Sequence, residues 1–445
     1  MCSLIPKQES VVILWKIKIA TLFPLNQKTY SDIIHLKGDE LMGTMISLGV
    51  GKLEIDWGKN GRYENFCDLF QPDDWKDIKY YYADNIVKIK KGYSRSLQLV
   101  KPRLDLLGYT LENIKKMYEN NFKEYCESMG KYAEKVLSFD EYFEVFSKIN
   151  LSEVNTLTEY DDWDFGEYIT KCIFEDNEIQ RLLNKYSKGH GGEFYENLPP
   201  RILIRILCEN PSALNLPLQW YVYDHMNNGW SKEEDLFPHL DDKNKILIVT
   251  EGKTDTFILQ RTINVLFSHI SDFFYFIDMQ ENYPFTGTGN LYNFASGLNK
   301  IKIQNKTIII FDNDVAGLLS YKQCKENLDN IPNLLFYHLP DYLSFKQFLT
   351  IGPNGEHYED INGKAVSIEC FLDLSFVAER TPKVRWTTYN NKCGQYQGAL
   401  IEKDEYTRIY KKHFCNSNYN KEKLRFLVND IIQYWCNNYK DCFEN

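Results

Sequence analysis

The chain has 445 residues and a formal net charge of −10 at pH 7. Its residues are 43% hydrophobic and 15% aromatic, which excludes a disordered chain and leaves room for two or three domains. Eleven cysteines are present without a Cys-x-x-Cys pair, which argues against a zinc ribbon and favours free thiols in a reducing cytoplasm. Because the chain is acidic, any contact with nucleic-acid phosphates must come from local basic segments.

The first part of the chain shows no pattern typical of a core element. The apolar segment Val11–Trp15 is much shorter than the roughly 20 residues that cross a membrane. No small-residue cleavage site follows it to indicate a signal peptide. We therefore expect translation to begin at Met42, residues 1–41 to be an upstream extension with little structure, and the protein to be cytoplasmic without membrane contact.

Residues 42–240 are predicted to form a mainly helical domain that begins with a β-hairpin. Residues 46–59 alternate apolar and polar side chains around glycines, as the strands of a hairpin do. Helices are predicted over 110–134, 138–149, 166–186 and 200–208, the second of them opened by a capping box from Ser138 to Glu141. The basic run 87–103 has two open interpretations, a phosphate-binding surface or a solvated cationic face.

Acidic residues follow two apolar segments in the region 241–345. Residues 245–250 and 307–311 are typical of buried parallel strands, and amphipathic segments that read as helices follow at 254–267 and 315–328. Glu251 follows the first strand, Asp255 lies one turn into the next helix, and Asp312 and Asp314 follow the second strand. Open α/β sheets bind ligands at the carboxyl ends of their strands. We expect these four carboxylates to converge and to require a divalent cation, Mg²⁺ or Mn²⁺.

The order strand, Glu-Gly, helix, strand, Asp-x-Asp, helix resembles the Toprim domain of topoisomerases, bacterial primases and a group of nucleases. This resemblance implies an α/β Toprim core with a parallel sheet flanked by helices. It further implies that Glu251 is a general acid or base and a metal ligand, and that Asp312 and Asp314 hold the metal. Asp255 matches an additional acid of the nuclease branch.

A second resemblance covers the N-terminal region. The segments Gly43–Trp57, Leu69–Pro72, Gly92–Arg95 and Lys101–Tyr109 look like the N-terminal region of bacterial HEPN/Toprim-associated proteins. Together with the Toprim core, the similarity would extend from Met42 to about Tyr410. It implies a nuclease of phage defence or of mobile elements.

Residues 346–445 are predicted to complete the site and to supply packing helices. In the overcoming-lysogenization-defect nucleases, to which the Toprim core is similar, further acids and a lysine complete a two-metal site. The resemblance implies that Glu369 or Asp360 is the further ligand and Lys403 the catalytic lysine. Glu369 could instead be a surface acid at a helix start, and Lys403 could be structural. The apolar spacing in residues 420–439 indicates a helix of the core or of a homodimer interface.

Nucleic-acid contacts are expected from Lys253, Arg385 and Trp386, because cations beside aromatic rings suit phosphate contact and base stacking. The sequence thus favours a Mg²⁺-dependent nuclease that hydrolyses DNA or RNA in bacterial antiviral defence. The alternative is a non-catalytic nucleic-acid-binding or toxin-like partner subunit that uses the Toprim fold as a scaffold. No Walker sequence is present, so ATP hydrolysis would have to come from a partner ATPase.

Overall fold

The computed structural model describes residues 45–58, 64–82, 86–130, 136–151, 165–175, 177–183, 191–227, 231–277, 288–328, 330–376, 381–391 and 393–439. They divide into two compact units, the first ending at His239 and the second beginning at Leu240, except that Asp105–Gly108 belongs to the second. The expectation for residues 1–41 lies outside the described residues. Within the described residues, none of the helices combines the length and apolar character that a membrane crossing requires.

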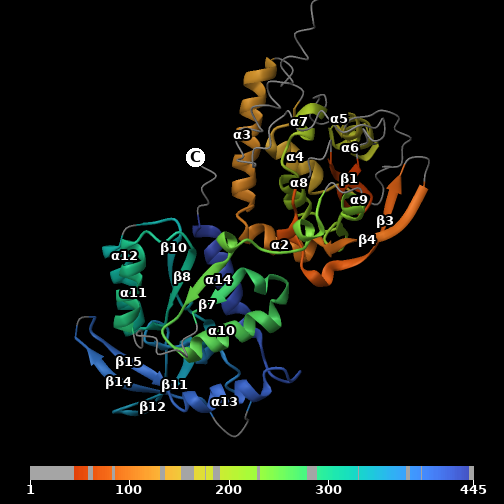
Figure 1. The fold of residues 1–445 in the computed structure, drawn as a ribbon. Helices are drawn as coiled ribbons and strands as arrows, with labels where there is room; N and C mark the ends of the chain where they lie inside the picture. The colour runs from red at the N-terminus through yellow and green to blue at the C-terminus, as the bar shows by residue number, and fades with distance from the viewer. Residues whose placement is uncertain are drawn as a thin grey trace, which may run out of the picture. The chain divides into compact units, whose positions relative to one another are not determined.

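The first unit contains an antiparallel sheet of five strands in the order β2-β1-β5-β4-β3, of which β1, β3 and β4 are labelled in Figure 1. The strands are β1 (Met45–Val50), β2 (Leu53–Gly58), β3 (Trp75–Tyr82), β4 (Ile86–Ser96) and β5 (Pro217–Trp220). Strands β1 and β2 form the expected hairpin, and Gly51 takes a φ of +61° in its turn, a conformation that favours glycine. The prediction of a single strand pair was incomplete, because the sheet has further strands. One of them, β5, lies late in the sequence of this unit and pairs with both β1 and β4.

The helices of this unit are α2 (Leu97–Leu106), α3 (Leu111–Met129), α4 (Phe139–Phe146), α5 (Phe165–Tyr168), α6 (Asn177–Leu183), α7 (Gly192–Glu196), α8 (Pro200–Leu207) and α9 (Tyr223–Asn227). The capping box is confirmed, since the Ser138 N–H donates to Glu141 Oε2 over 2.7 Å. The prediction of one helix over 166–186 was wrong, because a π-helical segment, Ile169–Phe174, separates α5 from α6. The Thr170 hydroxyl donates to the Gly166 carbonyl over 2.9 Å, a side-chain bond of the kind that bends helices.

The second unit is built on a parallel sheet of four strands in the order β10-β8-β6-β7. The strands are β6 (Ile246–Val249), β7 (Phe274–Phe276), β8 (Lys306–Phe311) and β10 (Leu334–His338), and the helices that pack on them are α10 (Lys253–Leu266), α11 (Thr288–Lys300), α12 (Val315–Asn327) and α14 (Glu422–Asn438). The predicted strands at 245–250 and 307–311 are confirmed, as are the helices that follow them. The fold of this unit is therefore α/β, with helices flanking a parallel sheet.

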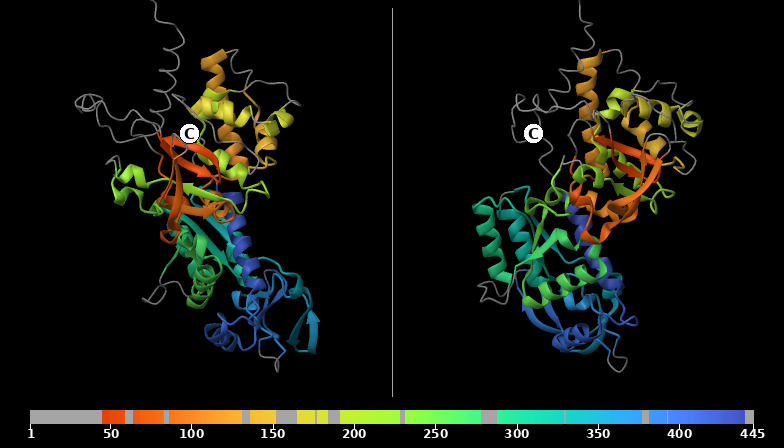
Figure 2. Two further views of the ribbon diagram at one scale, coloured as in Figure 1. Left: turned by 90° about the vertical axis from the view of Figure 1, so that its right-hand side faces the viewer. Right: turned by 45° about the vertical axis from the view of Figure 1, so that its right-hand side comes forward.

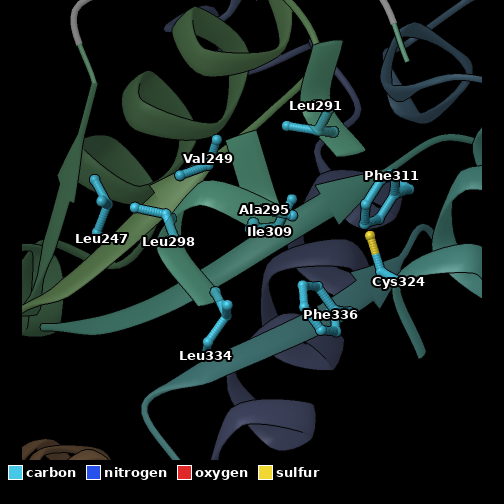
Figure 3. Packing of buried hydrophobic residues seen from close by; sticks show 10 residues of the cluster. All are labelled: Leu247, Val249, Leu291, Ala295, Leu298, Ile309, Phe311, Cys324, Leu334 and Phe336. Carbon is cyan, nitrogen blue, oxygen red and sulfur yellow. The ribbon is translucent and has the colours of Figure 1, made fainter. Parts of the chain in front are cut away.

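Alternate residues of the strands make the two apolar faces of this sheet. On one face, Leu247, Val249, Ile309, Phe311, Leu334 and Phe336 pack against Leu291, Ala295 and Leu298 of α11 and Cys324 of α12 (Figure 3). Helices α11 and α12 lie side by side there, as the right-hand view in Figure 2 shows. Helix α14 is tied to the edge strand β10, where Tyr337 Oη donates to Asp430 over 2.7 Å and Tyr434 Oη to the Phe336 carbonyl over 2.6 Å.

The connections between the strands create a topological switch point. From β6 the chain passes through α10 to β7 at one edge of the sheet, and from β7 it returns through α11 past β6 to β8. The direction of winding therefore reverses between β6 and β8. In open α/β sheets a crevice forms at the carboxyl ends of the strands at such a point, and ligands bind there. Glu251 and Asp312 follow β6 and β8 directly.

The C-terminal part of this unit adds a second sheet with the order β12-β11-β14-β15. Its strands are β11 (Phe348–Gly352), β12 (Gly355–Glu359), β14 (Val384–Asn390) and β15 (Gln395–Leu400), and α13 (Lys403–His413) follows them. Two short strands, β9 (Asn313–Asp314) and β13 (Ala365–Val366), pair antiparallel. This pairing fastens the C-terminal part of the chain to the acidic end of β8.

Candidate metal centre

Five acids and one lysine come together at the switch point of the second unit. They come from the ends of β6 and β8, the first turn of α10, the 3₁₀ helix Ile368–Phe371 and the start of α13, and they are Glu251, Asp255, Asp312, Asp314, Glu369 and Lys403. Their charges act on one another: Asp314 and Asp255 on Glu251, Glu369 on Asp255, and Lys403 on all four of Glu251, Asp255, Asp312 and Asp314. The structure thus brings together Lys403 and the predicted ligands apart from the alternative Asp360. These six residues are called the acid cluster below.

Asn313, between the two aspartates, fixes the end of β8. Its side chain is 1% exposed, its Nδ2 donates to Asp341 Oδ1 over 2.8 Å, and its Oδ1 accepts from the Gly363 N–H over 3.0 Å. A strand alternates its side chains between two faces, so an anchored Asn313 sends Asp312 and Asp314 to the other side. The sequence analysis missed this residue, and its position inside Asp-x-Asp was the only local signal.

Helix α12 begins directly against the end of β8. A Cβ atom on Gly317 would lie 2.3 Å from the Asp312 carbonyl oxygen, so only glycine allows this approach. Asp314 is the N-cap of the helix, and its Oδ1 accepts from the Gly317 N–H over 2.7 Å. The other oxygen accepts from Gln397 Nε2 of β15, and Gln397 Oε1 accepts from the Ala316 N–H over 3.1 Å. Both oxygens of Asp314 therefore already have donors.

The pairing of β9 with β13 brings Glu369 to the same place. Asp314 pairs with Ala365 and Asn313 with Val366, and Glu369 follows shortly after β13. Glu369 is fully buried, so the interpretation of this residue as a surface acid was wrong. Its Oε2 accepts from Ser367 Oγ over 2.8 Å and lies 3.0 Å from Lys403 Nζ.

Burial and mutual repulsion favour the protonated forms of these acids. Burial, together with the charges of Asp314 and Asp255, raises the pKa of Glu251 from 4.5 to about 8. Burial and the charge of Glu369 raise the pKa of Asp255 from 3.8 to about 7. The pKa of Asp312 is raised well above 3.8 by burial, Asp255 and Glu251. Burial lowers the pKa of Lys403, but the negative charges of the surrounding acids raise it by a larger amount. The net shift is upward, so the ammonium group stays charged.

Two carboxylate oxygens of the acid cluster are buried without a hydrogen-bond donor. Glu251 Oε1 and Glu369 Oε1 are buried and accept no hydrogen bond from any described residue. Uncompensated carboxylate oxygens of this kind suit a hard divalent cation. As the side chains stand, however, no group of three or more His, Cys, Asp or Glu in the described residues could hold a metal ion. In this arrangement Asp314 and Glu369 instead accept hydrogen bonds from protein donors.

The remaining predicted residues lie on the surface of the second unit. Lys253, the first residue of α10, and Arg385 on β14 are exposed, and Trp386 beside Arg385 is half-buried. Asp360, the alternative further ligand, is exposed and closes a turn by accepting from the Asn362 N–H over 2.9 Å. Glu369, rather than Asp360, lies in the acid cluster.

The second unit is thus an α/β domain with a carboxylate-lined site at its switch point. Residues 42–244 of the chain match the family model described as HEPN/Toprim N-terminal domain 1, which supports the expected HEPN/Toprim-associated family. The match ends before Glu251, so it covers none of the acid cluster. Neither a curated protein nor a solved structure matches the chain.

Proposed function

We propose that this protein is a Toprim-type nuclease that hydrolyses phosphodiester bonds of DNA or RNA with Mg²⁺ or Mn²⁺. One observation carries the proposal, the convergence of five carboxyl groups and Lys403 at the carboxyl ends of β6 and β8. A structural role does not require five buried or half-buried acids at one place, because each raises the pKa of its neighbours and destabilises the ionised site. A cation-binding site explains why the acids are clustered, because the cation neutralises their negative charges.

Each member of the acid cluster would have a defined role. Asp312 and Asp314 would hold the ion, with Glu251, Asp255 and Glu369 as further oxygen ligands. When bound, the ion supplies positive charge that polarises a phosphate oxygen and a water molecule. Glu251, whose pKa of about 8 leaves it protonated at neutral pH before a cation binds, would exchange a proton with the leaving or attacking oxygen. Lys403 would stabilise the negative charge that develops on the phosphate.

The match of residues 42–244 supports the biological role that we propose for this activity. Because the resemblance to HEPN/Toprim-associated proteins implies a nuclease-like, defence-related protein, and the family match supports that resemblance, we propose a role in bacterial antiviral defence. The placement of Lys403 against Glu369 supports a likeness to the overcoming-lysogenization-defect nucleases, in which a lysine completes the site. A partner ATPase and a homodimer remain part of this proposal.

A scaffold role is the second candidate, and two contacts favour it. Asp314 caps α12 with one oxygen and accepts from Gln397 with the other, and Lys403 is paired with Glu369. Both contacts hold the fold together without any ligand. In this reading the second unit would bind nucleic acid or a partner protein without cleaving it.

Cleavage by purified protein separates the two candidates. The substrates are plasmid, single-stranded DNA and total tRNA, each with Mg²⁺, Mn²⁺ or EDTA, and the proteins are wild type, Asp312→Asn and Asp360→Asn. Asp360→Asn is the matched control, because it removes an exposed carboxylate outside the acid cluster. We expect metal-dependent cleavage by wild type and Asp360→Asn, and a loss of orders of magnitude in Asp312→Asn. Equal cleavage by all three proteins would contradict the proposed site.

A further inference from the structure

The β14–β15 hairpin is a basic segment of an acidic chain. Residues 381–401 contain three basic side chains, Lys383, Arg385 and Lys392, and no acid, in a protein of net charge −10. Lys383 is paired with Glu356 over 2.7 Å. Arg385 is exposed and has no ion-pair partner among the described residues. The hairpin therefore presents an available guanidinium group to solvent.

Two tyrosines form an exposed aromatic pair on the same hairpin. Tyr389 of β14 and Tyr396 of β15 are direct cross-strand partners, with ring centroids 4.9 Å apart and ring planes at 63°. The two residues are 48% and 49% exposed, so both are accessible to a ligand. Cross-strand packing holds the rings in place, which lowers the entropy that a ligand must overcome to stack on them.

The aromatic pair adjoins the acid cluster through the backbone of β15. Tyr396 directly precedes Gln397, whose amide donates to Asp314. Consecutive Cα atoms are about 3.8 Å apart, and successive side chains of a strand point to opposite faces. The tyrosines therefore lie on the opposite face of β15 from the Gln397 side chain, which contacts the acid cluster. A nucleic-acid segment of a few nucleotides is long enough to pass from one face of β15 to the other.

We propose that Tyr389 and Tyr396, with Arg385, bind single-stranded nucleic acid and deliver it to the acid cluster. Stacking on protein aromatic rings requires a free base face, which a single strand offers and a continuous duplex does not. Arg385 supplies a cation for phosphate contact in a chain of net charge −10. This inference rests on the proposed nuclease function for the reaction, but the binding step that it describes is measurable without cleavage.

The test is binding in EDTA, where metal-dependent cleavage cannot occur. Labelled oligonucleotides of about 15 nucleotides, the scale of single-strand sites, are titrated by fluorescence anisotropy as single-stranded DNA, single-stranded RNA and duplex DNA. The variants are Tyr389→Ala, Tyr396→Ala, their Phe counterparts, and Arg385→Gln. The control is Tyr358→Ala, which removes a 65%-exposed tyrosine from β12 in the same sheet.

We expect wild type to bind a single strand more tightly than the duplex, and each Tyr→Ala change to weaken that binding by about tenfold. The Phe variants retain the ring and should bind as wild type does, as should Tyr358→Ala. Arg385→Gln should weaken binding and reduce its dependence on salt. The DNA and RNA arms identify which polymer is preferred.

Three results would overturn the inference: no binding of a single strand by wild type, equal binding of duplex, or unchanged binding in both Tyr→Ala variants. A protein partner for the aromatic pair would produce the first of these. The cleavage assay with Asp312→Asn reports on the acid cluster separately. Binding without cleavage would therefore refute the nuclease proposal alone, and cleavage with unchanged Tyr→Ala binding would refute this inference alone.

Discussion

Lys403 Nζ lies 3.0 Å from Glu369 Oε2, and the two side chains are 44% and 1% exposed. A lysine at the beginning of α13 thus extends from the solvent side to a carboxylate in the interior. This pair joins α13 to the 3₁₀ helix Ile368–Phe371 within the acid cluster. It also gives Lys403 a structural role in addition to the catalytic role that we propose.

Lys403→Met should separate these roles. The change leaves the Glu369 carboxylate buried without its cation, and we expect a loss of about 1–2 kcal/mol in the free energy of unfolding. The value is below the roughly 3–5 kcal/mol of fully buried pairs because Lys403 is partly exposed to water. Urea unfolding measures it.

The double variant Lys403→Met/Glu369→Gln supplies the control. Removing both charges should restore most of the lost stability, while cleavage stays low because the lysine and the proposed ligand Glu369 are both absent. Recovery of full cleavage together with stability would show that Lys403 acts only through the fold.

Stability without metal should fall as the pH rises. The pKa of Glu251 is 4.5 when exposed and about 8 in the folded protein, so the folded state keeps a proton that the unfolded state releases. Its contribution to stability is fully present below about pH 4.5 and is lost as the pH rises through about 8. Asp255 acts in the same direction between 3.8 and about 7. Urea unfolding in EDTA across this range measures the slope.

Glu251→Gln and added Mg²⁺ are the comparisons for this measurement. The variant has no proton to release at this position, so its slope should be smaller than that of wild type. Mg²⁺ stabilises the ionised acids and should also flatten the profile. A wild-type stability that rises with pH in EDTA would contradict the described burial of the acids.

Much of the acid cluster could be predicted because its signals are local. Glu251 and Asp312 directly follow apolar strand segments, and Asp255 lies one turn after Glu251, so short windows of sequence suffice. The position of Glu369 could not be derived in this way. It depends on the two-residue pairing of β9 with β13, which joins distant segments and has no sequence signature of its own. Only the family resemblance indicated it.

The sheet of the first unit shows the same limit. The β1–β2 hairpin is local and was predicted. Strand β5 joins the same sheet, but it follows helices α2 to α8 in the sequence. The basic run after residue 86 was interpreted by its charge, although it forms β4 and pairs with β3. Strand pairing over long separations depends on tertiary contacts that a single sequence does not display.

Gly317→Ala should disturb the site through the backbone alone. The new methyl group would lie 2.3 Å from the Asp312 carbonyl oxygen, so either α12 or the end of β8 must move. We expect a loss of about 1–3 kcal/mol, the usual range for overpacking, and weaker metal-dependent cleavage. Thermal unfolding and the plasmid assay measure the two effects.

Gly297→Ala is the matched control for this substitution. Gly297 lies in α11, and an added Cβ there meets nothing within 4 Å. Alanine should stabilise that helix by about 0.5–1 kcal/mol and leave cleavage unchanged. If both variants lost the same stability, the close contact at Asp312 would not be the cause.

Asp312→Asn should raise stability when no divalent cation is present. The substitution keeps the shape of the side chain and removes one of several buried, mutually repelling carboxyl groups. We expect an increase of about 1 kcal/mol at pH 8 in EDTA, where the remaining acids are most ionised. The gain should disappear in Mg²⁺, since only wild type then binds the ion tightly. A destabilised variant in EDTA would indicate that Asp312 has a structural role.

Calorimetric titration of metal-free protein with Mn²⁺ tests the central claim most directly, because it measures the cation site without requiring a substrate. Wild type and the control Asp360→Asn should bind Mn²⁺ with the release of protons, as expected where burial has raised the pKa of Glu251 and Asp255. Asp312→Asn should bind at least tenfold more weakly and release fewer protons. Equal Mn²⁺ affinity in wild type and Asp312→Asn, or no binding by wild type, would contradict the assignment of the acid cluster as a metal centre.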